Sequence, residues 1–245
     1  MATATQSIRE IVSAEPLAAA VLEGFEIDLC SQADTELERV CADLQLSVEQ
    51  VLEKLADAEA QAHGVIVPNV ESYSLTRLIQ HIVRIHHQTV RQDLPRYADL
   101  AQRIAGKQGG DAPHFKTAAK LIEQLCRDMR AHIQKEEQML FPYIVRLEEV
   151  AADGSPVPPA VFRTVLQPVS TMVREHDAAE GIMMRLRQLT NGFEPPAWAC
   201  PRNTAFHAGL AAFAQDLRRH VHLENDLLFP RAVALEAELV KRSQP

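Results

Sequence analysis

Apolar residues recur every three or four positions along four long stretches of the chain, a period that predicts amphipathic helices. The first stretch begins at Ser74, a favourable N-cap residue, and the others cover about residues 115–147, 161–189 and 204–240. The strand-like alternation of apolar and polar residues is not found. Glycine, proline and polar residues separate the stretches, so the sequence predicts an all-α fold built as an antiparallel four-helix bundle.

The first 60 residues show shorter helical patterns, one of which opens at Ser47, the first residue of a capping-box sequence. The periodicity is lost between residues 63 and 69, where glycine and proline are typical of a linker. The sequence therefore predicts a small helical N-terminal domain with its linker at residues 1–70, and a bundle domain at residues 71–245.

Charge and cysteine content narrow the class of protein. The net charge is −8 and no basic block occurs, so neither nucleic acid nor an anionic membrane is an expected partner. No apolar run approaches the ~18 residues of a spanning helix, and the N-terminus has no secretory signal pattern. The cysteines Cys30, Cys41, Cys126 and Cys200 form no CxxC pair. We therefore expect the reduced thiols of a cytoplasmic protein, with neither a disulfide framework nor a zinc site.

One eleven-residue pattern occurs twice, at residues 132–142 and 220–230. In each copy a Glu follows a His by four residues, and a Phe-Pro pair begins five residues after the Glu. Because a helix turns about 100° per residue, positions four apart share one face, so each copy presents an imidazole beside a carboxylate. The proline of each copy is expected to kink its helix just past the Glu.

A histidine on each preceding helix extends the repeat. His87 precedes His132 by 45 residues, and His176 precedes His220 by 44 residues. Four imidazoles and two carboxylates are too many for one tetrahedral zinc and fit two metal ions, each holding two His, with the carboxylates bridging. The mixed nitrogen and oxygen donors favour a first-row transition metal, iron foremost. The candidate metal ligands are His87, His132, Glu136, His176, His220 and Glu224.

These motifs resemble those of the hemerythrin-like di-iron proteins, and more closely the repair of iron centres family, a bacterial group linked to nitrosative and oxidative stress. The resemblance lies in the two eleven-residue patterns, in Glu175-His176-Asp177, and, more weakly, in the cysteine-bearing N-terminal part around Cys30. It implies a hemerythrin-like bundle that holds two iron ions per chain in an oxo- and carboxylate-bridged centre.

The resemblance also implies a function. It implies protection or repair of iron-sulfur clusters through iron donation or nitric oxide handling, with damaged iron-sulfur proteins and nitric oxide or dioxygen as partners. A conventional enzyme is not expected, with redox or nitric oxide chemistry at the di-iron site as the alternative. The sequence leaves open whether the chain forms a homodimer. The family's Cys-Cys pair is Cys30-Ser31 here, and a single thiol has fewer options in exchange chemistry. This departure favours the alternative, a protein that binds, scavenges or senses nitric oxide or dioxygen without repair activity.

The ligand of the first helix has two candidates. Measured from Leu75, His86 lies at about 20°, in the centre of the apolar arc, whereas His87 lies at about 120°, at its edge. The register of the family and the spacing to His132 favour His87, which we choose.

Three further side chains carry expectations. Asp128 and Glu175 are candidate hydrogen-bond acceptors for a ligand imidazole, although a solvated position for Glu175 is an equal alternative. His222 lies two residues from His220 and is expected at the surface.

We expect the purified protein to hold close to two iron ions per chain. Glu136→Ala or Glu224→Ala should lower the iron content, because each change removes a proposed bridge between the metals. Metal analysis of the wild type and both variants tests this expectation. Full iron content in both variants would contradict the di-iron assignment.

Overall fold

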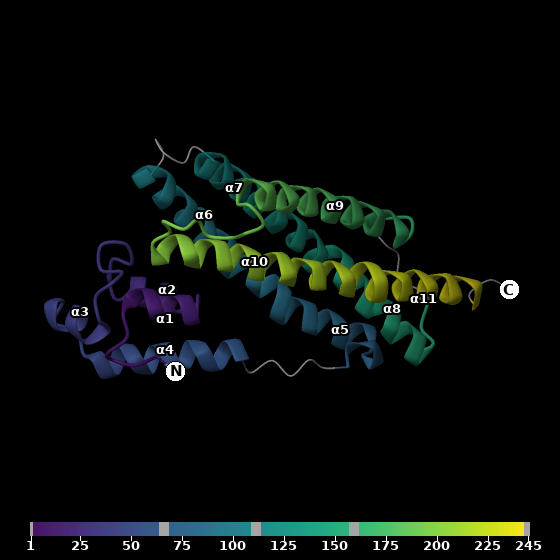
Figure 1. Cartoon of the computed structure of the whole chain (residues 1–245). Coiled ribbons are helices and arrows are strands. Elements are labelled where there is room, and N and C mark those ends of the chain that lie inside the picture. Colours follow the sequence, from purple (N-terminus) through teal and green to yellow (C-terminus); the bar gives the residue numbers. More distant parts are fainter. Residues whose placement is uncertain (1, 64–68, 109–113, 157–161, 243–245) are drawn as a thin grey trace. The chain divides into compact units, whose positions relative to one another are not determined.

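The computed structural model describes residues 2–63, 69–108, 114–156 and 162–242, and every named element in these ranges is a helix (Figure 1). The all-α prediction is therefore confirmed. None of the helices in these ranges is long and apolar enough to cross a membrane. The chain divides into two compact units. Unit 1 consists of Met1–Val67, Asp99–Ala118 and Arg187–Ala212, and unit 2 of Pro68–Ala98, Ala119–Leu186 and Phe213–Pro245.

The N-terminal part of unit 1 contains α1 (Ile8–Ala14), α2 (Ala18–Gly24), α3 (Leu37–Asp43) and α4 (Val48–His63). Ser47 caps α4 as predicted, because its hydroxyl accepts a hydrogen bond from the amide of Gln50 at 3.2 Å. The helices share an apolar core that includes Ile8, Leu22 and Leu37, all fully buried. Most of the predicted linker lies outside the described residues, and the domain boundary at residue 70 stays a prediction.

One prediction about the cysteines is wrong. Cys30 and Cys200, 170 residues apart in the sequence, form a disulfide, whereas Cys41 and Cys126 are free thiols. The expectation of reduced cysteines rested on their spacing along the chain, and spacing cannot show that the fold brings two distant cysteines together.

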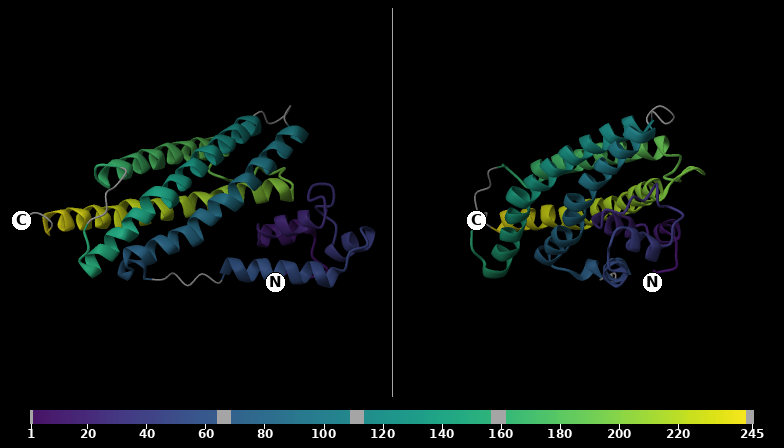
Figure 2. Two further views of the ribbon diagram at one scale, coloured as in Figure 1. Left: turned by 180° about the vertical axis from the view of Figure 1, so that it is seen from behind. Right: turned by 90° about the vertical axis from the view of Figure 1, so that its left-hand side faces the viewer.

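Unit 2 takes its helices from four rods that lie side by side and run in alternating directions (Figures 1 and 2). The predicted antiparallel bundle is thus confirmed. The short 3-10 helix η1 (Val70–Ser72) precedes the first rod. The rods are α5 (Leu75–Ile82), η2 (Val83–His87) and α6 (Gln88–Gln108); α7 (His114–Lys135), η3 (Glu136–Leu140) and α8 (Phe141–Asp153); α9 (Leu166–Leu189); and α10 (Pro201–His222), η4 (Leu223–Leu228) and α11 (Phe229–Arg242).

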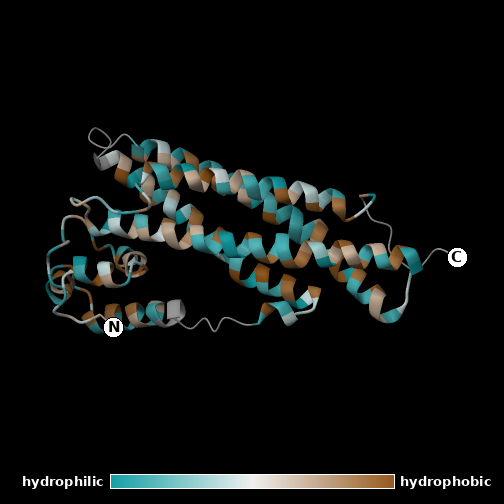
Figure 3. Ribbon diagram, turned by 45° about the vertical axis from the view of Figure 1, so that its right-hand side comes forward, coloured by the Kyte–Doolittle hydropathy of each residue, from teal (hydrophilic) through white to brown (hydrophobic). Residues whose placement is uncertain are grey.

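Apolar and polar residues alternate around each rod, as the colouring of Figure 3 shows. The main apolar core of unit 2 contains Leu78, Ile82, Ile144 and Leu228, none of which is exposed. A fully buried side chain of this kind contributes about 1.5–3 kcal/mol to folding. The core therefore holds the four rods together around the polar groups of the bundle interior.

Three of the rods described in unit 2 change from α-helical to π-helical geometry in the segments η2, η3 and η4. The segments η3 and η4 end directly before the two Phe-Pro pairs. A proline has no amide hydrogen and clashes with the carbonyl four residues earlier, here Gln138 for Pro142 and Asp226 for Pro230. Both carbonyls lie inside the widened π turns. The helices therefore depart from α geometry where a proline kink was predicted, and they do so by widening.

Two helices begin at other residues than predicted. The fourth rod begins at Pro201, three residues before the predicted start, because proline is well suited to the first position of a helix. The third rod begins at Leu166, and the predicted start at Val161 lies outside the described residues. At the start of α9, the amide of Val165 donates to both carboxylate oxygens of Glu236, at 3.0 and 2.9 Å.

The carboxylate of Glu236 is the buried anchor of this helix start. It is 8% exposed and also accepts a hydrogen bond from the hydroxyl of Tyr143 at 2.7 Å. Glu236→Ala should lower the free energy of unfolding by about 2–3 kcal/mol, because two donors lose a charged acceptor. Urea unfolding followed by circular dichroism measures the change.

A matched control lies two residues further along the same helix. Glu238 is exposed and pairs with Arg242 on the helix surface, so Glu238→Ala should change stability by no more than about 0.5 kcal/mol. Equal losses in the two variants would show that the buried carboxylate does not anchor the start of α9.

Candidate metal centre

The six predicted ligands converge inside unit 2. None of their side chains is more than 1% exposed. In the part of the chain that the structure describes, two groups of four residues have ligand atoms within 4.8 Å of one another. The groups are His132, His176, His220 and Glu224, and His87, Glu136, His220 and Glu224. The structure therefore brings together all six residues, and their role as ligands stays a prediction.

The carboxylate of Glu136, at the start of η3, lies between two imidazoles from different rods. Its Oε2 atom is 3.2 Å from Nε2 of His132 and 3.3 Å from Nε2 of His87. The His132 contact follows from the four-residue spacing, whereas the His87 contact depends on packing of the first rod against the second. A single oxygen of Glu136 thus lies beside one imidazole of the first rod and one of the second.

Glu224, in η4, occupies the matching place in the other half of the repeat. Its two oxygens lie 3.0 Å from Nε2 of His176 and 3.0 Å from Nε2 of His220. The Nε2 atoms of His132 and His176 are 3.0 Å apart. His87 and His220 form the second imidazole pair, with ring centroids 5.0 Å apart. Each carboxylate therefore connects one imidazole of the first pair to one of the second.

Three of the four imidazoles form a hydrogen bond through Nδ1, the ring nitrogen that faces away from the two carboxylates. A neutral imidazole that donates its Nδ1 proton keeps the Nε2 lone pair free, as a metal ligand requires. The pairs are His87 with Glu137 at 2.6 Å, His132 with Glu175 at 3.0 Å, and His176 with Asn225 Oδ1 at 3.0 Å. The acceptor role predicted for Glu175 is confirmed.

The two charged acceptors have cationic partners of their own. Glu137 accepts a hydrogen bond from Arg91 at 2.7 Å, and Glu175 accepts one from Lys135. Burial would raise the pKa of both carboxyl groups, but Arg91 and Lys135, together with the imidazoles, lower it. Both groups therefore stay ionised and able to accept the Nδ1 protons.

The acceptor role predicted for Asp128 is wrong. Asp128 is exposed and accepts a hydrogen bond from Gln124 on its own helix, at 3.4 Å. Nδ1 of His132 instead contacts Glu175 on α9, where burial is incomplete and Lys135 offsets the charge. His222 is exposed and pairs with Asp226 at 2.6 Å, as expected for a surface residue.

The acceptors Glu137 and Asn225 were missed by the sequence reasoning. Each directly follows a glutamate of the repeated motif, so the second copy of the pattern could have drawn attention to both. Asp216, which accepts from His86, was missed as well, although it lies four residues before His220, as Asp128 lies four residues before His132.

The first-rod histidines lie together in the π segment η2. His87 directs Nε2 to Glu136, whereas His86 directs Nδ1 to Asp216 at 2.8 Å and stacks its ring on that of His220. A π turn contains more residues than an α turn, so a wheel of 100° per residue counted from Leu75 misplaces the residues in it. The widened turn explains why the residue placed at the edge of the arc lies in the interior.

Two phenylalanines of the repeated motif cover the imidazoles. Phe141 stacks on His87 with an angle of 12° between the rings, and Phe229 stacks on His176 with an angle of 6°. Both phenylalanine rings are buried. The Phe of each motif thus covers a histidine of another rod and keeps water from its face.

The charges of the site fit a bound cation. Nε2 of His87, both oxygens of Glu136 and Oε2 of Glu224 are buried and form no hydrogen bond. Buried polar atoms of this kind are costly unless a partner or a metal satisfies them.

Burial would lower the pKa of His87, but Glu136 and Glu224 raise it to about 10. Burial would raise the pKa of Glu224, but His220, His176 and His87 lower it. A proton on the imidazole of His87 therefore balances part of the negative charge of the two carboxylates. A bound metal ion would take over this role.

The chain is similar to proteins of the hemerythrin HHE cation binding domain family and to iron-sulfur cluster repair proteins. The hemerythrin HHE cation binding domain family matches residues 78–232, a range that contains all six candidate ligands. The iron-sulfur cluster repair protein YtfE of Musicola paradisiaca is 30% identical over 95% of the chain and 98% of its own length. The protein of the same name from Enterobacter sp. (strain 638) is 30% identical over 96% of the chain and 100% of its own length. A probable iron-sulfur cluster repair protein of Haemophilus influenzae is 28% identical over 95% of the chain and 99% of its own length.

The two adjacent histidines of η2 allow a direct test of the ligand set. His87→Ala should lose bound iron, because Nε2 of His87 faces the carboxylates, whereas His86→Ala should retain it. Iron content and the visible absorption of the iron-loaded protein are the measurements. Loss of iron in His86→Ala with retention in His87→Ala would reverse the assignment.

Proposed function

Because the chain belongs to the repair of iron centres family of hemerythrin-like proteins, we propose that it repairs or protects iron-sulfur clusters under nitrosative or oxidative stress. The observation that carries the proposal is the placement of two buried carboxylates, each between two imidazoles from different rods. The proposed partners are damaged iron-sulfur proteins, and the proposed small ligand is nitric oxide or dioxygen.

We assign two iron ions to the site. His132 and His176 would hold one ion, and His87 and His220 the other. Glu136 and Glu224 would bridge them, because each lies beside one imidazole of either pair. Non-haem iron held in this way supplies a reducible centre that binds nitric oxide or dioxygen and a store of iron that can be donated.

The protein's own groups prepare this site before the metal binds. Glu137 and Glu175 hold the imidazoles of His87 and His132 through Nδ1 and so aim Nε2 inward. Phe141 and Phe229 cover the rings and limit the entry of water. Burial of both carboxylates away from water strengthens their attraction for a cation.

The alternative function is the binding, scavenging or sensing of nitric oxide or dioxygen without repair. The observation that favours it is Cys30, which stands where the family has a pair of adjacent cysteines and is disulfide-bonded to Cys200. In this state Cys30 offers no thiol for transfer of iron or a nitrosyl group. Binding of nitric oxide without restored cluster activity would support this alternative.

The decisive assay is recovery of aconitase in an extract damaged by nitric oxide. Addition of the iron-loaded protein should speed recovery, and Glu224→Gln should slow it by ~10-fold or more, because a neutral amide is a poor bridge. Glu149→Gln is the matched control, since Glu149 lies at the surface and pairs with Arg146. Recovery at the same rate with wild type, Glu224→Gln and no added protein would refute the repair function.

A further inference from the structure

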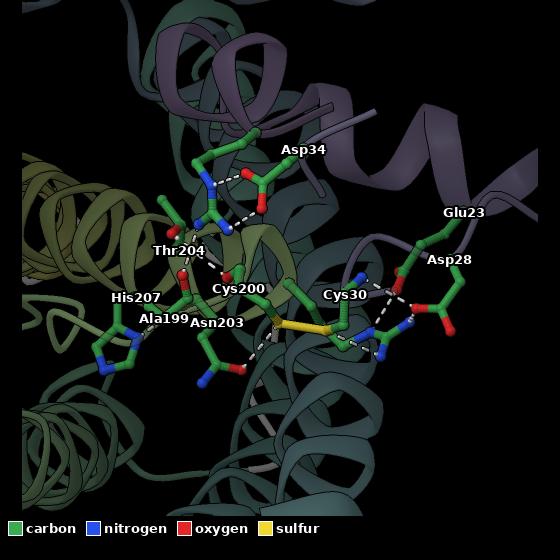
Figure 4. Close-up of a disulfide and its surroundings, with 11 residues drawn as sticks. Glu23, Asp28, Cys30, Asp34, Ala199, Cys200, Asn203, Thr204 and His207 are labelled. Carbon is green, nitrogen blue, oxygen red and sulfur yellow. Dashed lines mark hydrogen bonds and ion pairs between the residues drawn. A yellow bond between two sulfur atoms is a disulfide. The ribbon is translucent and has the colours of Figure 1, made fainter. Parts of the chain in front are cut away.

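The Cys30–Cys200 disulfide of unit 1 lies in a polar setting that differs at its two sulfurs (Figure 4). Cys30 follows α2, and Cys200 directly precedes α10. Both residues are partly buried. Nη1 of Arg202, in the first turn of α10, donates to Sγ of Cys30 at 3.5 Å. The disulfide therefore has a cation in direct contact with one of its sulfur atoms.

Two carboxylates fix the position of this cation. Arg202 is 6% exposed, and its Nε donates to Glu23 at 2.9 Å while Nη2 lies 3.5 Å from Asp28. Asp28 also accepts a hydrogen bond from the amide of Cys30 at 3.0 Å. The guanidinium thus uses separate nitrogens for the carboxylates and for the sulfur, and it cannot easily turn away from Cys30.

Cys200 has a different neighbour. Its Sγ lies 3.8 Å from Oδ1 of Asn203, an oxygen that can accept a hydrogen bond from a thiol but does not stabilise a thiolate. The N-terminus of α10 favours negative charge near Cys200. A direct hydrogen bond from a charged group has the stronger effect, so Cys30 is the sulfur better able to carry the charge of a thiolate.

Solvent reaches the Cys30 end of this arrangement. A groove of about 580 Å³ in unit 1 is lined by Asp28 and Arg202, both of which contact Cys30. Glu23 and Arg103 also line it, so its walls carry both signs of charge. A thiolate released at Cys30 would therefore face both a fixed cation and water.

We propose that Cys30–Cys200 is a thiol–disulfide exchange site whose substrate is a dithiol reductant. A thiolate of the dithiol attacks Sγ of Cys200, the Cys30–Cys200 bond breaks, and Cys30 leaves as a thiolate held by Arg202. The second thiol of the reductant then loses its proton and attacks the reductant's own sulfur in the mixed disulfide. The bond between that sulfur and Cys200 breaks, and Cys200 leaves as a thiolate that takes up the released proton. Two electrons pass to the protein, the dithiol becomes a disulfide, and Cys30 takes up its proton from solvent.

The first experiment follows reduction of the folded, full-length protein by dithiothreitol, with acid quenching and maleimide labelling of the released thiols. The bond should open while the helical circular dichroism is unchanged. Arg202→Gln should slow the reaction by ~10-fold, because the leaving thiol loses its cation, and Arg202→Lys should restore part of the rate.

Arg9→Gln is the matched control. Arg9 donates to the carbonyl of Ala199 at 3.0 Å, beside Cys200, and to the carboxylate of Asp34. It therefore stabilises the surroundings of the disulfide through oxygen acceptors, whereas Arg202 donates to a sulfur. Substitution of Arg9 should leave the rate unchanged. Reduction that requires unfolding in urea, or equal rates in wild type and a folded Arg202→Gln variant, would overturn the proposal.

The second experiment uses only the wild-type protein and therefore does not depend on the folding of a variant. Brief treatment with glutathione, trapping of free thiols and peptide mass analysis locate the mixed disulfide. Glutathione should be found on Cys200 and the trapping reagent on Cys30. The reverse distribution would show that Cys30 is the attacked sulfur and would overturn the proposed direction of exchange.

Discussion

Two fully buried carboxylates, Glu136 and Glu224, impose the main constraint on the bundle. An ionised carboxylate inside a protein costs several kcal/mol unless charge and hydrogen bonds compensate it. Four imidazoles from four helical rods surround the pair, and several of their atoms still have no hydrogen bond. A bound cation would balance the charge of the two carboxylates. The hydrogen-bond acceptors that hold the imidazoles, the phenylalanine rings stacked on them and the π-helical turns all fit a site built for such a cation.

The two halves of the repeat surround their buried carboxylates with similar but not identical side chains. In each half a Glu follows a His by four residues, and a Phe covers an imidazole of another rod. The residue after each Glu differs, because Glu137 carries a charge and Asn225 does not. A carboxylate acceptor makes an imidazole a stronger electron donor than an amide acceptor does. The imidazole of His87 should therefore be a stronger electron donor to bound metal than the imidazole of His176.

The helices and the set of six residues could be predicted from the sequence, because an acid beside a histidine on an apolar helix face, repeated at the same spacing, is costly unless a metal binds there. The position of His87 followed from the spacing of the repeat and the register of the family, while the helical wheel pointed to His86. The wheel failed because η2 is π-helical, and single-sequence periodicity does not register a widened turn. Asp128 was misjudged because its phase was counted on its own helix, whereas the acceptor of His132 comes from α9. The Cys30–Cys200 bond joins residues 170 positions apart and had no local signal.

We propose that Glu136 and Glu224 lie between two iron ions, each held by one pair of histidines. Crystals of the protein loaded with iron without oxygen would test it by anomalous diffraction at the iron absorption edge. We expect two peaks of similar height per chain, one beside His132 and His176 and one beside His87 and His220. A single peak, or a peak beside His86 and Asp216, would contradict it.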